Sequence, residues 1–179
     1  MQDVNLISQT DRVFDILARV ISKIIEAKAG QNHQATSSQV QALKYLANHE
    51  PCTISTIAEG LGISQPAATM LINRMEKRGL VQRRPSETDR RQLEVSLTSQ
   101  GHLILSQIER TRLDKLSEIL ELMSIDERNQ LLTAIENFVS ATLKKFRECA
   151  NEVCLRCGDN HDPSCIVSQT RDNAEQKLV

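Results

Sequence analysis

Five cysteines occur in this 179-residue chain, and four of them gather near its C-terminal end. Their spacing is Cys149-x4-Cys154-x2-Cys157-x7-Cys165, and His161 lies inside the last interval. Thiolate and imidazole groups this close together are typical ligands of soft metal ions. The spacing therefore predicts a metal centre in the tail, although thiols that stay reduced in a mobile segment are an open alternative.

The identity of that metal stays open between two candidates. The C-x4-C-x2-C start is the ligand spacing of plant-type iron–sulfur proteins, although a fourth cysteine so close by departs from that pattern. The pair Cys154-x2-Cys157 is equally half of a zinc knuckle, which Cys165 or His161 could complete as the fourth ligand. We favour an iron–sulfur cluster and keep Zn²⁺ as the alternative.

Arginine side chains form a second group with distinctive chemistry. The whole chain carries a net charge of -1, yet residues 51–97 hold seven basic residues against five acidic ones. Four of the seven flank a single polar turn: Arg83, Arg84, Arg90 and Arg91. Clustered guanidinium groups suit phosphates and the strong negative potential of the DNA minor groove. This charge distribution indicates binding to double-stranded DNA.

Two helices and a hairpin are expected to position these arginines. A short helix over Thr53–Glu59 is followed by a glycine turn over Gly60–Gly62, and a second helix then begins at Ser64 and stops at Gly79. Ser64 is a suitable N-cap, because its hydroxyl accepts from the free amides of the first turn. A helix, a tight turn and a second helix make up a helix-turn-helix.

The residues after Gly79 predict a β-hairpin. Residues 80–84 and 92–97 alternate well enough to pair as strands, with a polar turn over Pro85–Asp89 between them. A hairpin in this position makes the motif a winged helix-turn-helix. The predicted fold class is therefore mainly α, with a small β-hairpin as the wing.

The second helix presents two different faces. Leu71, Ile72 and Met75 form an apolar stripe, and small or amide side chains that suit base edges in the major groove lie opposite. The predicted DNA-binding residues are Ser64, Gln65, Ala68, Thr69, Asn73, Arg74, Arg83, Arg84, Asp89, Arg90 and Arg91.

The wing resembles that of a known family. Asp89-x-Arg91, followed by Leu93, Val95 and Leu97-Thr98, is similar to the D-x-R…L-T signature of the MarR family of bacterial transcriptional regulators. The resemblance covers roughly residues 10–147. It implies that Asp89 orients Arg91, that Arg91 enters the minor groove, and that a small organic effector binds between the dimer helices and the DNA-binding domain.

Two departures from the family accompany this resemblance. Met70 stands at a position of the second helix where polar or basic residues are common in the family. The cysteine-rich tail beyond Arg147 is not part of the ordinary family pattern.

Long amphipathic helices on both sides of the winged segment predict a homodimer. A capping box, Ser124-x-x-Glu127, opens the last of them. The apolar stripes are Val13, Leu17, Val20, Ile21, Ile24 and Ile25; Leu103, Ile108, Leu113, Leu116, Leu120 and Met123; and Leu131, Leu132, Ile135, Phe138, Val139 and Leu143. Each stripe is too narrow to make a core alone, and a two-fold dimer reads two half-sites of a palindromic operator. A monomeric helical bundle is the alternative.

The expected organisation has four parts. Residues 1–50 form N-terminal helices, 51–97 the winged helix-turn-helix, 98–147 the C-terminal dimerisation helices, and 148–179 the cysteine-rich tail, disordered at its end. No apolar run is long enough for a membrane span, and the N-terminus does not read as a signal peptide, so a cytoplasmic location is expected. With only 2% aromatic residues, the core must be aliphatic.

The cysteine outside the tail and the isolated histidines give little indication of a catalytic or metal site. Cys52 is expected to be a half-buried thiol in the loop before Thr53, and His33, His49 and His102 lack an i, i+4 partner that would suggest a ligand pair. No nucleophile–base set or phosphate-binding loop appears, so the chain is not expected to be an enzyme.

Two classes of function fit these patterns. The first is a sequence-specific transcriptional regulator, and more specifically a repressor, that a metal centre in the tail modulates. The second is a redox or electron-transfer protein that uses the cysteine cluster on a helical scaffold. An electron carrier has no need of four arginines around one turn, so the wing favours the regulator.

Overall fold

The computed structural model describes residues 2–32, 35–87, 91–146 and 165–167 of the chain. The elements in chain order are α1 (Gln2–Asn32), α2 (Ser37–His49), β1 (Cys52–Thr53), α3 (Ile54–Leu61), α4 (Gln65–Lys77), β2 (Val81–Pro85), β3 (Leu93–Leu97), α5 (Ser99–Leu120) and α6 (Ile125–Lys145). This order confirms the prediction of a mainly helical winged helix-turn-helix.

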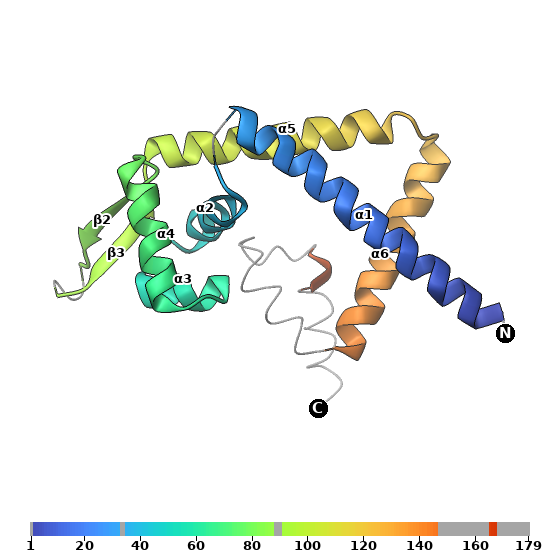
Figure 1. Ribbon diagram of the computed structural model, residues 1–179, viewed down its shortest axis with the longest axis horizontal. Helices are drawn as coiled ribbons and strands as arrows, with labels where there is room; N and C mark the ends of the chain where they lie inside the picture. Colours follow the sequence, from blue (N-terminus) through green and yellow to red (C-terminus); the bar gives the residue numbers. More distant parts are fainter. Residues whose placement is uncertain (1, 33–34, 88–90, 147–164, 168–179) are drawn as a thin grey trace.

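The elements separate into two parts that α5 joins (Figure 1). Helices α2, α3 and α4 gather around the small sheet at one end, and α5 begins beside the sheet and runs away from it. Helix α6 turns back from the far end of α5, and α1 crosses α6 (Figure 1). Within the described ranges, no helix combines the length and hydropathy that a bilayer crossing requires.

The sheet has three strands in the order β1-β3-β2, all antiparallel. Strand β1 pairs Cys52 with Val95, so the expectation that Cys52 lies in a loop is wrong. A two-residue strand carries no periodicity that a sequence pattern could reveal. Pro85 pairs with Leu93 at the end of β2, so it belongs to the strand and not to the turn. Proline is tolerated there because β2 is an edge strand.

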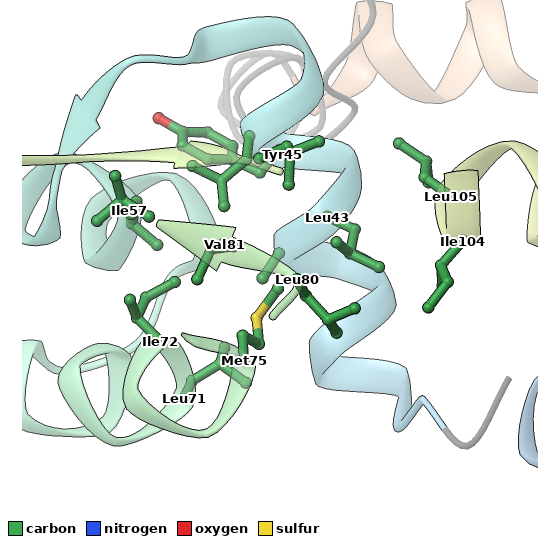
Figure 2. Packing of buried hydrophobic residues seen from close by; sticks show 14 of the residues in the cluster. Leu43, Tyr45, Ile57, Leu71, Ile72, Met75, Leu80, Val81, Ile104 and Leu105 are labelled. Carbon is green, nitrogen blue, oxygen red and sulfur yellow. The ribbon is translucent and has the colours of Figure 1, made fainter. Parts of the chain in front are cut away.

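The core lies between α2, α3, α4, the sheet and the start of α5 (Figure 2). It is aliphatic as expected, with Tyr45 as the aromatic ring that contributes to it. Its largest fully buried side chains are Leu43, Leu46, Ile57, Ile72, Met75, Leu80 and Val95. This packing fixes α4 against the sheet and therefore sets the direction in which its exposed face points.

Helix α3 extends further than expected, through Gly60 to Leu61. A Cβ atom at Gly60 would lie 2.1 Å from Cε2 of Tyr45, so glycine is needed here for close packing of α3 on α2 and not for a turn. The chain turns instead at Gly62, the left-handed C-cap. The prediction of a turn beginning at Gly60 is therefore wrong by two residues.

Both ends of α4 follow the prediction. The Ser64 hydroxyl accepts from the backbone N–H of Ala67 at 3.4 Å, and Pro66 lies in the first turn. Helix α4 ends before Gly79, whose φ of +67° is a conformation that side chains with a Cβ rarely adopt. The glycine thus lets the chain leave the helix and enter β2.

Helices α5 and α6 leave much apolar surface exposed. In the first half of α5, Ile108 is buried in the core together with Ile104 and Leu105, which were not in the predicted stripe. Leu103 is 51% exposed, so its place in a buried stripe was predicted wrongly, and Leu113 farther along is 66% exposed. The predicted capping box opens α6, since Ser124 and Glu127 each accept from the other's backbone N–H.

Candidate nucleic-acid interface

The exposed face of α4 carries Gln65, Thr69 and Asn73. Residues four apart lie one above another on a helix, so these three side chains form a single row. Ser64 and Arg74 are also exposed, at the start and near the end of the helix. The row consists of amide and hydroxyl groups, which can donate to and accept from base edges.

Ala68 does not belong to this face. Its side chain is fully buried, so the prediction that Ala68 approaches a base edge is wrong. Position 68 is one turn before Ile72, which is also fully buried, and the two therefore share the core side of the helix. Met70 is 57% exposed and stands beside the polar row.

Arg83 of the wing turns toward α4. Its Nη2 donates to Oδ1 of Asn73 at 2.7 Å, and its Nη1 lies 3.0 Å from Oε2 of Glu76 in an ion pair. The sequence pattern placed Arg83 with the arginines around the turn and gave Glu76 no role. In the structure, Arg83 instead contacts Asn73, the last residue of the exposed polar row on α4.

The other wing arginines lie nearer the turn. Arg84 is exposed, and its Nη2 donates to Oε1 of Gln82 at 3.1 Å. Arg91 is exposed as well. Asp89 and Arg90 lie outside the described residues, so the orientation of Arg91 by Asp89 stays a prediction.

A polar contact ties the end of α4 to α2. Nη1 of Arg78, the C-cap residue of α4, donates to Oε1 of Gln39 at 2.7 Å. Gln39 is buried and also forms the capping box of α2 with Thr36. Gln39 was not among the residues predicted from the sequence, although the run Thr36-x-x-Gln39 is a capping-box signature that could have revealed it.

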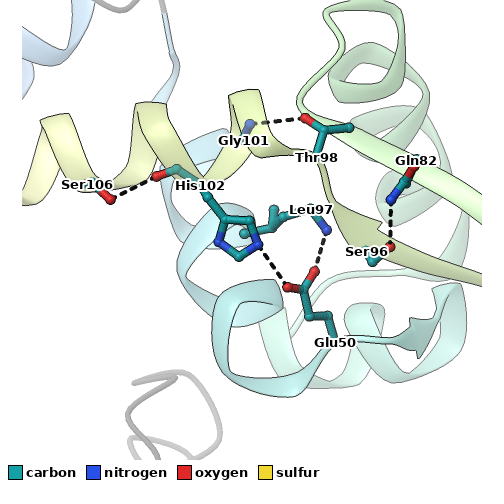
Figure 3. A network of polar contacts seen from close by, with 8 residues as sticks. All are labelled: Glu50, Gln82, Ser96, Leu97, Thr98, Gly101, His102 and Ser106. Atoms are coloured by element: carbon teal, nitrogen blue, oxygen red, sulfur yellow. Dashed lines mark hydrogen bonds and ion pairs between the residues drawn. The ribbon is translucent and has the colours of Figure 1, made fainter.

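A second polar contact joins the winged part to α5 (Figure 3). Nε2 of His102 lies 3.1 Å from Oε1 of Glu50, and Oε2 of Glu50 accepts from the backbone N–H of Leu97. Thr98 caps α5 beside them, since its hydroxyl accepts from the N–H of Gly101 at 3.1 Å. His102 therefore has a carboxylate partner that its sequence neighbours did not reveal.

Cys52 is more deeply buried than expected, with 7% of its surface exposed. Burial raises the pKa of its thiol to about 11, and the nearby carboxylates of Glu50 and Glu94 add to the shift. The thiolate is the reactive form of cysteine. Cys52 is thus held in its unreactive form at neutral pH.

Most of the predicted metal centre lies outside the described residues, namely Cys149, Cys154, Cys157 and His161. Cys165 is described, and it packs against the small cluster of Leu143 and Val167 beside the end of α6. In the described ranges, no three His, Cys, Asp or Glu side chains gather closely enough to hold a metal ion.

The capped helix α4, the tight turn before it and the antiparallel wing after it define a winged helix-turn-helix protein. Residues 25–92 match the sequence model of the MarR family. This segment is similar to that family, and the curated relatives that match the chain are transcriptional regulators.

Two curated relatives match shorter segments. The chain is 39% identical over 90 residues to the HTH-type transcriptional regulator YfiV of Bacillus subtilis, covering 50% of this chain and 56% of that protein. It is 35% identical over 77 residues to the transcriptional repressor MprA of Escherichia coli, covering 43% of this chain and 44% of that protein. The chain thus spans about half the length of the curated relatives it matches.

Solved structures share the fold over a longer stretch. YusO from Bacillus subtilis superposes with a TM-score of 0.69 at 23% identity, over 76% of this chain and 96% of that one. A variant of MepR from S. aureus, bound to an oligodeoxyribonucleotide, superposes with a TM-score of 0.61 at 19% identity, over 74% of this chain and 97% of that one. These two likenesses concern the fold alone.

Proposed function

We propose that the protein is a sequence-specific DNA-binding regulator, and more specifically a repressor, that acts on a palindromic operator. The exposed row of Gln65, Thr69 and Asn73 on α4 carries this proposal. Amide side chains pair with base edges in the major groove, which is wide enough to admit a helix. The relative MprA is named a transcriptional repressor, and the MepR variant was solved with an oligodeoxyribonucleotide.

The wing supplies contacts of a different kind. Arg84 and Arg91 are exposed at the two sides of the turn, where cations can reach the minor groove and the phosphates that border it. Phosphate contacts add affinity on any sequence, and base contacts add the preference for one sequence. In this proposal α4 provides specificity and the wing arginines provide most of the electrostatic attraction.

The proposed active form is a homodimer. Helices α1 and α6 meet where the rings of Phe14 and Phe138 lie 4.7 Å apart, yet Phe138 remains 51% exposed. Val13 and Ile135 on the same two helices are 62% and 46% exposed. Large apolar side chains grouped in this way are typical of a surface that another protein covers. A second copy of the chain would cover them and supply the second recognition helix.

Two modulators belong to the proposal as well. Cys165 packs beside Leu143, near the end of α6, so a metal centre with Cys149, Cys154, Cys157 and Cys165 as ligands would adjoin the dimer helices. Loading or loss of an iron–sulfur cluster, or of Zn²⁺, would then bias the spacing of the two recognition helices. The family resemblance adds a small organic effector that binds between these helices and the winged part.

Selection from a library of randomised DNA duplexes tests the proposed function. The full chain should enrich sequences with two inverted half-sites whose centres lie about 10 base pairs, or a multiple of one helical turn, apart. Light scattering of the complex should give two protomers for each duplex. Enrichment of no sequence, or of single unpaired half-sites bound by one protomer, would contradict the proposal.

A further inference from the structure

We propose that Arg83 is a positioning residue that holds the amide of Asn73 with its donor group toward DNA, so that Asn73 favours guanine over adenine. This inference rests on the proposed function and specifies how one residue of α4 reads a base.

The geometry places one guanidinium against two side chains of α4. Arg83 donates through Nη2 to Asn73 at 2.7 Å and through Nη1 to Glu76 at 3.0 Å. Asn73 and Glu76 are three residues apart and therefore neighbours on the helix surface. The two arms of the planar guanidinium engage both of them at once, which fixes its orientation.

The ion pair with Glu76 restricts Arg83 further. The side chains of Arg83 and Glu76 are 22% and 39% exposed, so the pair is sheltered for most of its surface. Moving Arg83 to a phosphate would leave the Glu76 carboxylate without this partner. Arg83 is therefore better placed to organise α4 than to bind the DNA backbone.

The donor-only chemistry of arginine determines which way the amide faces. A guanidinium has five N–H donors and no acceptor, so it is the Oδ1 atom of Asn73 that turns toward it. An amide group is planar, and the Nδ2 donors point away from the atom that Oδ1 contacts. Asn73 is exposed, so Nδ2 is the group it has left to offer a base.

This orientation changes the base that Asn73 prefers. Asparagine recognises adenine with both groups, since Oδ1 accepts from N6 while Nδ2 donates to N7. With Oδ1 turned toward Arg83, the best-matched base edge is that of guanine, whose N7 and O6 are both acceptors. Adenine keeps N7 as an acceptor for Nδ2, but it loses the bond from its N6 amino group to Oδ1 because Oδ1 faces Arg83, whereas guanine offers two acceptors to the donor group.

Arg84 provides a matched control. It is the same residue type one position along β2, and successive side chains of a strand point to opposite faces. Its Nη2 contacts Gln82 on its own strand and not α4. If Arg84 serves as a phosphate contact, its loss should weaken binding by a similar factor on every sequence.

The test measures base preference at each operator position by competition between duplexes that differ in one base pair. The variants of the full chain are Asn73→Ala, Arg83→Met, their combination, and Arg84→Met. Wild type should prefer guanine at one position of each half-site by about tenfold over adenine. Asn73→Ala should remove this preference, and Arg83→Met should shift it toward adenine.

The combined variant separates positioning from direct contact. Once Asn73 is absent, Arg83→Met should cause no further change at that position, because the two residues act through one contact. Arg83→Lys is a second variant that tests the same contact in case Arg83→Met does not fold. Lysine keeps the positive charge but lacks the two-armed guanidinium that contacts both Asn73 and Glu76. Arg83→Lys should shift the preference in the same direction as Arg83→Met.

Two results would overturn the inference while leaving the proposed function intact. One is a wild-type preference for adenine at the position that Asn73→Ala affects. The other is a uniform loss of affinity in Arg83→Met, matching that of Arg84→Met, with the base preferences unchanged. Failure of the wild-type protein to prefer any sequence would contradict the proposed function itself.

Discussion

The imidazole of His102 lies 3.1 Å from the carboxylate of Glu50, which joins the start of α5 to the residue that ends α2. The same carboxylate accepts from the backbone N–H of Leu97 at the end of β3. Glu50 therefore links α2, β3 and α5 at the place where the long helix α5 leaves the winged part (Figure 3).

Replacing Glu50 should cost more stability than replacing His102. Glu50→Ala leaves the Leu97 N–H without its acceptor, which costs about 1–3 kcal/mol. His102 is half exposed, and an ion pair in such surroundings contributes about 1 kcal/mol or less. Urea unfolding of the two single variants should give this order. A greater loss in His102→Ala would show that the hydrogen bond to Leu97 is not what stabilises the junction.

The Cys52 thiol should react slowly in the folded protein. Burial raises its pKa from 9.0 to about 11, so at pH 8 the thiolate fraction falls by about a hundredfold relative to a thiol of ordinary pKa. Alkylation with iodoacetamide, followed peptide by peptide with mass spectrometry, measures this rate. The matched reference is the same peptide in the urea-unfolded chain, and equal rates in the two states would contradict the buried position.

The same pKa shift predicts how stability depends on pH. The folded state holds the Cys52 proton more tightly than the unfolded state, so this contribution to stability is complete below pH 9. It is lost as the pH rises from 9 through about 11, where the thiolate must be buried for the protein to stay folded. Cys52→Ala should lose less stability than wild type across that interval.

Metal content should depend on the cysteines of the tail and not on Cys52. Single Ser substitutions of Cys149, Cys154, Cys157 or Cys165 should lower it sharply, because a site with four ligands loses one of them. The visible spectrum of anaerobically purified protein distinguishes the two candidates, since an iron–sulfur protein is brown and a zinc protein is colourless. Full metal content in the Cys165 variant alone would point to His161 as the fourth ligand.

If the metal centre also regulates DNA binding, metal-loaded and metal-free protein should differ in operator affinity by about 1–3 kcal/mol. Equal affinities would make the centre a structural one and would reject its role as a sensor.

Local signals in the sequence were sufficient for much of the fold. Ser64 and Gly79 mark the ends of α4 because capping and a left-handed backbone depend on the residue at the position itself. The Ser124–Glu127 capping box is predictable for the same reason. The alternation in residues 92–97 likewise identifies β3, since one face of that strand is buried.

Features that depend on tertiary neighbours could not be predicted in this way. Gly60 is needed because Tyr45 packs against it, which no local pattern reveals. Ala68, in contrast, lies three and four residues before Leu71 and Ile72, so the helical period could have placed it on the buried face. The partners of Arg83 lie seven and ten residues away on another element, so no helical or strand period connects them. Residue types were enough to predict an arginine-rich wing but not which arginine turns toward α4.

In the proposed function, α4 reads bases while the wing adds sequence-independent affinity. Its most direct test compares the Kd for the selected operator with the Kd for a random duplex of equal length at one salt concentration. Wild type should favour the operator by about a thousandfold or more. Gln65→Ala should weaken operator binding by about fivefold or more and leave random binding unchanged, whereas Arg91→Ala should weaken operator binding by about tenfold or more. Equal wild-type affinities for the two duplexes, or a parallel loss on both in Gln65→Ala, would contradict the account.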